Sequence, residues 1–245
     1  MKSSKKKVKP HLVKIWCIGK INAEFLARME NILQLYRLPY DERFPLICFD
    51  ERPCFLIGDV IEGLDLSADQ VRKLHYEYEK NGSCCLLLAI EPLTGKRIAI
   101  IYDKRRKIEY AEFMQIVASH FPKAEKIRVI QDNLNTHYKS SFYERFDAQT
   151  ALELSEKFEF HYTPKKASWL NAAEIEFSAI ARACLKQRIP TKEILEKQVY
   201  ACVNEREKKQ IKINWKFSII DARRKLNKHY KKVNPENEKF AQKEN

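Results

Sequence analysis

The segment PLICFD, residues 45–50, is a short apolar run that ends in a carboxylate. Such a run, bounded by charged and turn-forming residues, is typical of a strand buried in a sheet. The segment KIRVIQD, residues 126–132, repeats the pattern. Asp50 and Asp132 are therefore predicted at the ends of two strands, where the loops of an α/β sheet bring side chains together from distant parts of a sequence.

Further elements complete an α/β pattern around these two runs. Residues 83–92 are predicted as a strand that turns through LTGK into residues 97–103, and residues 158–163 as a fifth strand. Residues 52–82 hold three of the five glycines and are expected to be irregular. The fold class that follows is a mixed five-stranded sheet flanked by helices. Helices are expected from Asn22 to before Pro39, at about 109–120, within 138–157, from Asn171 to about 188, and from Thr191 onward.

Composition indicates a folded protein that needs no covalent support. The chain has 245 residues, of which 44% are hydrophobic and 32% charged, and a chain of this size buries a core without disulfides. Its seven cysteines form no Cys-x-x-Cys pair and are expected to be reduced, mostly buried, and not zinc ligands. No apolar run approaches the roughly 18 residues of a spanning helix, and no signal peptide is recognisable, so a cytoplasmic protein is expected.

The net charge of +13 is concentrated at the two ends of the chain. Residues 1–10 carry five lysines and no acid, and residues 182–245 carry 18 Lys and Arg against 8 Asp and Glu, which leaves −2 for residues 11–181. Lysine-rich ends either aid solubility or attract a polyanion, because Lys and Arg that neutralise phosphates release condensed counterions. Charge alone does not decide between nucleic acid and a membrane surface.

The two strand-end aspartates have structural as well as chemical interpretations. Asp50 is explained either by an ordinary strand exit or by a functional site. Asp132 is explained either by an Asx-turn or by a functional site. Asp132 begins DNLNTH, residues 132–137, which holds more hydrogen-bonding side chains than a simple chain reversal requires. This polar density favours a site at Asp132 more than the sequence around Asp50 does.

Glu174 is a third candidate, in the helix expected to begin at Asn171. It lies three residues after Asn171, so the two residues fit a capping box. It also lies one helical turn from the apolar Phe177, so its carboxylate is expected to lean toward the sheet. Glu176 points elsewhere on the same helix and is expected to be a solvated surface acid.

Asp50, Asp132 and Glu174 converge if the two strands are neighbours and the helix crosses their ends. Three carboxylates about 4 Å apart repel each other by roughly 4 kcal/mol per pair at an effective dielectric constant near 20, so such a cluster requires bound cations. Oxygen ligands select Mg²⁺ or Mn²⁺, and a two-metal site holds the attacking and leaving oxygens of a phosphoryl displacement. A phosphodiester substrate agrees with the basic ends.

Other catalytic motifs are absent from the sequence. There is no GxxxxGK, GxGxxG, HExxH or GxSxG pattern. His137 is set apart by its place in the polar segment 132–137. Four other histidines are isolated in the sequence and are interpreted as structural and not catalytic, namely His75, His120, His161 and His229.

At these motifs the chain resembles the DDE transposases of bacterial insertion sequences in the mariner superfamily. The matching segments are CFDE at 48–51, DNLNTH at 132–137 and HYTPKKASWLNAAEIEFS at 161–178. The resemblance runs from about residue 8 to about residue 230, and its SWLNAAE segment is highly specific. Lesser matches lie at residues 76–92, 103–113 and 215–226.

The resemblance implies a ribonuclease H-like catalytic domain in which Asp50, Asp132 and Glu174 hold two Mg²⁺ ions, with Mn²⁺ as a substitute. The ions would activate water, and later a DNA 3′-hydroxyl, for cleavage at element ends and strand transfer into target DNA. Residues beside the site are expected to position it, namely Glu51, Asn133, His137 and Asn171. The basic residues expected to contact double-stranded DNA are Lys165, Lys166, Arg182, Arg223, Arg224 and Lys225.

Two features depart from the family pattern. Asp132 and Glu174 are 42 positions apart, more than in eukaryotic mariner members, although the bacterial branch tolerates a helical insertion here. Family members also carry a helix-turn-helix region before the catalytic domain, and residues 1–44 supply none. The expected organisation is a basic arm and helix at 1–44, left from a linker, a catalytic domain at 45–189, a basic helical region at 190–230 and a disordered tail at 231–245.

The function that follows is that of a transposase catalytic domain, cytoplasmic and associated with the bacterial nucleoid. Its expected partners are double-stranded DNA at transposon ends and target, a second copy in a homodimer, and a separately encoded or frameshift-fused helix-turn-helix protein. One alternative is an inactive DNA-binding or dimerising remnant without metal-dependent activity. Another is a two-metal nuclease or resolvase of the same fold, which cleaves DNA without strand transfer.

Overall fold

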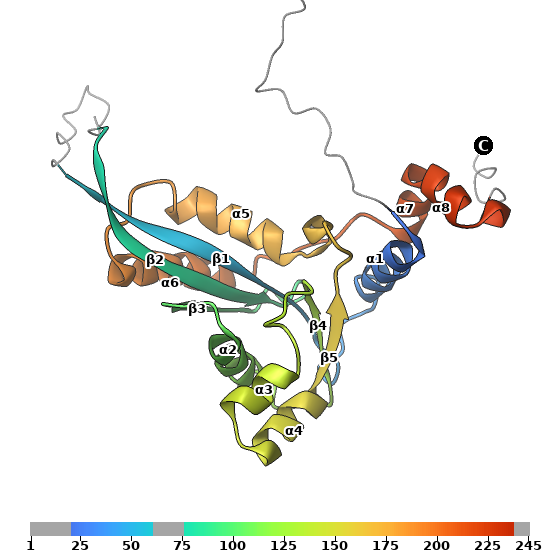
Figure 1. The fold of residues 1–245 in the computed structure, drawn as a ribbon, viewed down its shortest axis with the longest axis horizontal. Helices are drawn as coiled ribbons and strands as arrows, with labels where there is room; N and C mark the ends of the chain where they lie inside the picture. Colours follow the sequence, from blue (N-terminus) through green and yellow to red (C-terminus); the bar gives the residue numbers. More distant parts are fainter. Residues whose placement is uncertain (1–20, 61–75, 238–245) are drawn as a thin grey trace, which may run out of the picture.

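A mixed five-stranded sheet lies at the centre of the computed structural model, which describes residues 21–60 and 76–237 (Figure 1). Its strands are β1 (Leu46–Asp59), β2 (Tyr78–Ile90), β3 (Arg97–Tyr102), β4 (Ile127–Gln131) and β5 (Phe158–Tyr162). They lie in the order β3-β2-β1-β4-β5, with β1, β2 and β3 antiparallel and with β4 parallel to both β1 and β5. The predicted mixed five-stranded sheet flanked by helices is confirmed.

The pairing of β1 with β4 brings Asp50 and Asp132 to the same level, although Asp50 lies within β1 and not at its end as predicted. Cys48 pairs with Ile130 in parallel register, and Asp50 and Asp132 follow these residues by two positions in each segment. Neighbouring strands lie about 4.8 Å apart, and residues at equal levels project to the same face. The condition set by the sequence, that these two strands be neighbours, is therefore met.

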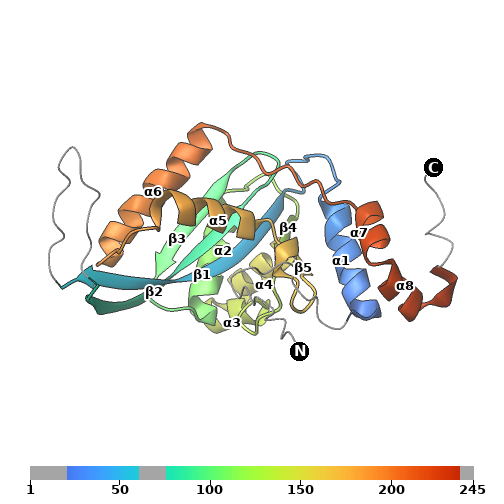
Figure 2. The same cartoon turned by 90° about the horizontal axis from the view of Figure 1, so that it is seen from above.

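Helices cover both faces of the sheet (Figures 1 and 2). Ile47 and Phe49 pack in the cluster beneath α2, whereas Cys48 between them packs in the cluster with α1, because successive strand residues alternate between faces. One face carries α2 (Lys107–Ser119), α3 (Ser140–Arg145) and α4 (Ala148–Lys157). The other carries α1 (Ala23–Leu35), α5 (Ala173–Cys184), α6 (Lys192–Lys208), α7 (Ile219–Lys225) and α8 (Asn227–Val233).

Two predicted helix starts are confirmed by their capping bonds. The Asn22 side chain accepts a hydrogen bond from the backbone N–H of Phe25 over 2.9 Å at the start of α1. The Thr191 hydroxyl accepts one from Ile194 over 3.4 Å at the start of α6. Each side chain satisfies a backbone donor that the first helical turn leaves free.

The expectation that residues 52–82 are irregular is wrong for the described part of this segment. β1 continues to Asp59 and β2 begins at Tyr78, and the two strands pair along an arm that projects beyond the sheet (Figure 1). The backbone N–H of Ile57 also donates to the carbonyl oxygen of Ile189 over 2.8 Å. Pairing between strands holds this arm, whose β2 side is solvent-exposed and has no apolar run at residues 78–83, while its β1 side carries the apolar residues 54–57.

The cysteines behave as predicted where the structure describes them. Cys48, Cys54, Cys84 and Cys85 are buried and free of disulfides. Cys184 and Cys202 are also free and half-buried, and Cys17 lies outside the described residues. Within residues 21–60 and 76–237, none of the helices has the length and apolar character needed to cross a membrane.

Candidate active site

Three predicted carboxylates lie on separate elements that meet beside β1. Asp50 lies in β1, Asp132 directly follows β4, and Glu174 lies in the first turn of α5. Burial raises the pKa of Asp50 to about 7, the backbone N–H of Glu51 opposes this, and the charges of Glu174 and Asp132 raise it further. The register of β1 and β4 sets Asp132 level with Asp50, and the bond from Asn171 to Phe49 holds the start of α5, which carries Glu174, against β1.

The chemistry of this donor set suits a hard divalent cation. Carboxylate oxygens are the ligands that Mg²⁺ and Mn²⁺ prefer, and a cation would relieve the repulsion that raises the pKa of Asp50. Among the residues that the structure describes, no three His, Cys, Asp or Glu side chains are arranged closely enough to hold a metal ion. The residue types fit the ion, but in this structure their side chains are not arranged as a complete set of ligands.

His137 lies beside the carboxylates in a fully buried position. Its Nδ1 atom is 2.6 Å from Oδ1 of Asp132, and its Nε2 atom is 3.7 Å from Oε2 of Glu51. Burial acts to lower the pKa of His137, but these two carboxylates outweigh it and raise the pKa to about 9. The ring packs between Phe49 and Tyr110, with ring centroids 5.2 and 4.9 Å away. His137 is therefore a buried cation at neutral pH that holds Asp132.

The loop after β4 is anchored by hydrogen bonds from neighbouring side chains. The backbone carbonyl oxygen of His137 accepts bonds from Gln131 Nε2 over 2.9 Å and from the Tyr162 hydroxyl over 3.0 Å. The Asn133 side chain accepts a bond from the Tyr138 hydroxyl over 2.7 Å. These contacts explain the polar density of the segment that begins with Asp132, because its side chains and backbone bind each other at the sheet edge.

Glu51 points to the opposite side of β1 from Asp50, as the alternation of a strand requires. Its side chain is only 4% exposed and lies 3.0 Å from a guanidinium nitrogen of Arg105. The side chain of Glu51 therefore reaches the site through His137, whereas its backbone N–H donates to Oδ1 of Asp50 over 2.8 Å. Its positioning role remains a prediction.

Asn171 ties the start of α5 to the strand that carries Asp50. Its side-chain amide donates to the carbonyl oxygen of Phe49 over 2.7 Å, and its side-chain oxygen accepts from the backbone N–H of Ala173 over 3.1 Å. Its own backbone N–H donates to Ser168 over 2.7 Å and not to Glu174. The capping-box alternative is therefore excluded, and α5 begins at Ala173 instead of Asn171.

Tyr36 reinforces this junction from α1. Its hydroxyl donates to the carbonyl oxygen of Leu170 over 2.8 Å and accepts from the backbone N–H of Ala172 over 3.0 Å. The ring stacks on Trp215 with centroids 4.5 Å apart. The sequence gives no local sign of this role, because Tyr36 lies more than 130 positions before the backbone groups that it binds.

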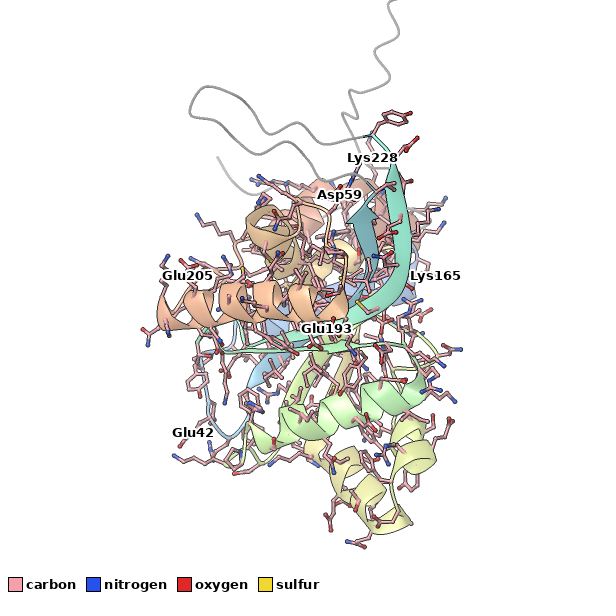
Figure 3. All side chains as sticks on the ribbon, turned by 90° about the vertical axis from the view of Figure 1, so that its left-hand side faces the viewer. Glu42, Asp59, Lys165, Glu193, Glu205 and Lys228 are labelled. Atoms are coloured by element: carbon pink, nitrogen blue, oxygen red, sulfur yellow. The ribbon has the colours of Figure 1, made fainter. Side chains whose placement is uncertain are left out.

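A groove of about 650 Å³ opens beside Asp132. Its walls are the start of α1, the loop after β4 and the loop after β5. Lys165 and Lys166, both exposed, lie in that last loop and line the groove (Lys165 is labelled in Figure 3). Arg28 of α1 lines it as well. The structure thus brings two of the predicted DNA-contacting lysines to the same groove as one of the carboxylates.

The other predicted DNA-contacting residues lie away from this groove. Arg182 is exposed on α5. In α7, Arg223 pairs with Glu30 over 2.8 Å, Arg224 with Asp221 over 3.0 Å, and the Lys225 ammonium lies 5.3 Å from the centroid of the Phe217 ring. Contacts within the chain therefore engage the three basic residues of α7.

Comparison with known proteins identifies the family of this chain. The DDE superfamily endonuclease family matches residues 45–196, which include Asp50, Asp132 and Glu174. The chain belongs to this family. Among curated proteins, none matches the chain.

Solved structures of transposases and integrases resemble the chain at low identity. A Mos1 transposase paired-end complex with left transposon end has a TM-score of 0.48 and 13% identity, over 81% of this chain and 64% of that one. A Mos1 mariner paired-end complex with Mn gives 0.47 and 13%, over 82% and 66%. The HTLV-2 integrase catalytic core domain with magnesium gives 0.34 and 15%, over 70% and 87%. The chain thus spans less than two thirds of the Mos1 chain's length, and these scores are too low to add to the family match.

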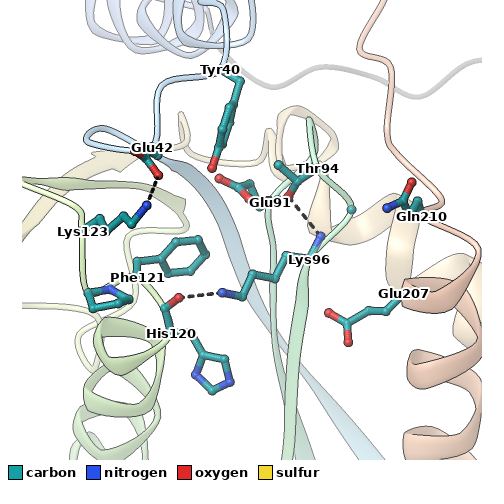
Figure 4. A pocket seen from close by; sticks show the side chains of 12 residues that line it. Tyr40, Glu42, Glu91, Thr94, Lys96, His120, Phe121, Lys123, Glu207 and Gln210 are labelled. Carbon is teal, nitrogen blue, oxygen red and sulfur yellow. Dashed lines mark hydrogen bonds and ion pairs between the residues drawn. The ribbon is translucent and has the colours of Figure 1, made fainter.

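Another hollow, of about 450 Å³, lies where β2 turns into β3 (Figure 4). Its polar side chains mostly bind each other or the nearby backbone. The Lys96 ammonium donates to the carbonyl oxygen of His120 over 2.6 Å, and Lys123 pairs with Glu42 over 3.1 Å. Buried Glu91 accepts a hydrogen bond from the Thr94 hydroxyl. This hollow therefore lacks the crowding of like charges that marks the carboxylates.

Glu176 is a residue that the sequence led us to misplace. The expectation of a solvated surface acid is wrong, because Glu176 is fully buried and pairs with Arg97 of β3 and Arg206 of α6. These partners lie 79 positions before it and 30 positions after it. No local pattern signals pairs at such separations.

Proposed function

We propose that this endonuclease-family chain is the catalytic domain of a transposase, which cleaves DNA strands at the ends of a mobile element and transfers them into a target. The observation that carries the proposal is the placement of Asp132 and Glu174 near Asp50, whose pKa burial raises and their charges raise further. A largely buried carboxylate with like charges nearby is costly to a fold. The presence of these carboxylates in a chain of an endonuclease family supports a catalytic role.

In this proposal the three carboxylates hold two Mg²⁺ or Mn²⁺ ions. When bound, such ions lower the pKa of water and neutralise charge that develops on a phosphate. The chain's own residues hold the site in shape. The His137 cation fixes the direction of the Asp132 side chain, while Asn171 holds the start of α5 against the backbone next to Asp50.

The groove beside Asp132 is the proposed path of the DNA. Lys165 and Lys166 line it and would neutralise backbone phosphates without reading bases. Arg182 would extend this contact, and the basic residues of α7 would do so only where their present partners release them. A homodimer on paired transposon ends and a helix-turn-helix partner that selects the ends complete the proposal, with the complex acting at the bacterial nucleoid.

The test is nicking of supercoiled plasmid DNA by the purified chain in Mg²⁺ or Mn²⁺. We expect metal-dependent nicking that falls by about a thousandfold in Asp132→Asn and in Glu174→Gln, because each variant loses a metal ligand. The matched control is Glu153→Gln at an exposed position of α4, which removes the same charge from the face of the sheet opposite α5.

The outcomes separate this proposal from its alternatives. Metal-independent nicking, or equal nicking by Asp132→Asn, Glu174→Gln and Glu153→Gln, would contradict the assignment of the three carboxylates. Duplex binding without nicking in either metal would indicate an inactive remnant. Cleavage of an oligonucleotide carrying the element's end, without joined products on a sequencing gel, would indicate a nuclease or resolvase.

A further inference from the structure

A buried ion-pair network joins the catalytic helix to two other elements. Arg97 of β3 donates to both carboxylate oxygens of Glu176, over 2.8 and 3.0 Å. Arg206 of α6 donates to the same two oxygens over 2.6 and 2.9 Å. The side chains of Arg97 and Glu176 are fully buried, and that of Arg206 is 20% exposed. One carboxylate is thus held by two guanidinium groups, each through two bonds, the geometry that fixes direction most firmly.

Arg97 extends this network to the chain beyond α6. It also donates to the backbone carbonyl oxygens of Gly95 and Ile211, the latter over 2.7 Å. Its backbone N–H donates to the side chain of Glu207 over 2.6 Å. β3, α5, α6 and the segment after α6 therefore meet at Arg97, as the packing of α6 across the sheet allows (Figure 2).

The position of Glu176 on α5 relates this network to the carboxylates. Successive residues of an α-helix are rotated by about 100°, so Glu176 points roughly 200° away from Glu174, to nearly the opposite side of the helix. Glu174 acts on Asp50, and Glu176 is held by Arg97 and Arg206. A rotation of α5 that moves one carboxylate must move the other.

We propose that Arg97, Glu176 and Arg206 are positioning residues that set the rotation of α5 and thereby aim Glu174 at Asp50 and Asp132. Asn171 fixes where α5 begins, and the ion-pair network fixes the rotation of α5 about its own axis. The inference rests on the proposed function, because it assigns Glu174 to the metal site. It adds that the α6 region, outside the predicted catalytic domain, is needed to complete that site.

Arg206 is the residue to change, because it is partly exposed and its loss leaves the buried pair of Arg97 and Glu176 in place. In Arg206→Gln we expect the Mn²⁺ concentration for half-maximal nicking to rise about tenfold, as when a residue that orients a metal ligand is lost. Binding of Mn²⁺ to the full chain without DNA, followed by electron paramagnetic resonance of free Mn²⁺, should weaken by a similar factor. Arg206→Lys should recover part of both effects.

The matched control is Arg188→Gln. Arg188 pairs with Asp59 over 2.6 Å, its side chain is 21% exposed, and the pair does not involve α5. We expect a similar fall in Tm for Arg188→Gln and Arg206→Gln, with Mn²⁺ binding weakened only in the latter. Equal Mn²⁺ binding in the two variants would overturn the positioning role, and this comparison holds whether or not DNA is nicked. Absence of metal-dependent nicking in the wild type would instead contradict the proposed function.

Discussion

Two glutamates on one helix, Glu174 and Glu176, lie in opposite electrostatic surroundings. Glu174 belongs to a group of carboxylates whose repulsion helps to raise the pKa of Asp50 to about 7. Glu176 is more deeply buried, and although burial alone would raise its pKa, Arg97 and Arg206 hold it below the usual range. Glu176 is therefore neutralised by cations of the protein, whereas Glu174 lies near other acids.

This difference separates a structural charge from a functional one. A buried acid with two guanidinium partners needs nothing from outside the protein. A group of acids without a full set of cationic partners retains a free-energy cost, which a bound ion can remove. Acids that lack a full set of cationic partners therefore indicate the candidate active site, and buried acids with guanidinium partners indicate the structure that supports it.

The largest expected effect comes from exchanging each of the two glutamates for glutamine. Glu176→Gln leaves Arg97 buried without a counter-charge, so we expect the free energy of unfolding to fall by about 3 kcal/mol or more. Glu174→Gln relieves repulsion on Asp50, so we expect a change of less than about 0.5 kcal/mol, or a gain. Urea denaturation in EDTA measures both. Similar falls in the free energy of unfolding of the two variants would contradict the distinction between structural and functional acids.

A smaller effect is expected from Asp50→Asn, and it depends on pH. The pKa of Asp50 rises in the folded chain from its ordinary value of 3.8 to about 7. The folded state thus binds a proton that the unfolded state releases, so the free energy of unfolding falls as pH rises from about 4 to about 7 and stays lower above that. Asparagine carries no charge, so in EDTA at pH 8 we expect Asp50→Asn to raise Tm by at least about 2 °C.

The same variant at pH 4 provides the control. At that pH Asp50 is largely protonated in the folded protein, so the variant and the wild type should have nearly equal Tm. His137 also loses stabilisation as pH rises, from about 6.5 to about 9, but it is present in both proteins and its contribution largely cancels. A lower Tm for the variant at pH 8 would show that the ionised Asp50 is not under strain.

The sequence predicted the sheet and the equal level of Asp50 and Asp132 because both depend on local patterns. Apolar runs that end in Asp50 and Asp132 mark strands, and neighbouring parallel strands then bring the two aspartates to one level. The arm made by the ends of β1 and β2 was missed because the glycines of residues 52–82 indicated turns and because the exposed start of β2, at 78–83, has no apolar pattern.

The residues that support Glu174 could not be predicted from local sequence patterns. Asn171 was expected to cap a helix, but its side chain binds the backbone of Phe49, 122 positions earlier. Tyr36 and Glu176 likewise depend on partners that only the folded chain brings near. Polar side chains can satisfy their hydrogen bonds locally or at long range, and the local sequence is the same in both cases.

The most direct test of the central claim, that the crowded carboxylates are a cation site, is the Tm of the chain with and without Mg²⁺. A ligand at ten times its dissociation constant stabilises a folded protein by about 1.4 kcal/mol, so Mg²⁺ should raise the wild-type Tm by about 3 °C or more. We predict that Glu174→Gln loses most of this rise and that Glu153→Gln keeps it. An equal rise in all three proteins would contradict the account.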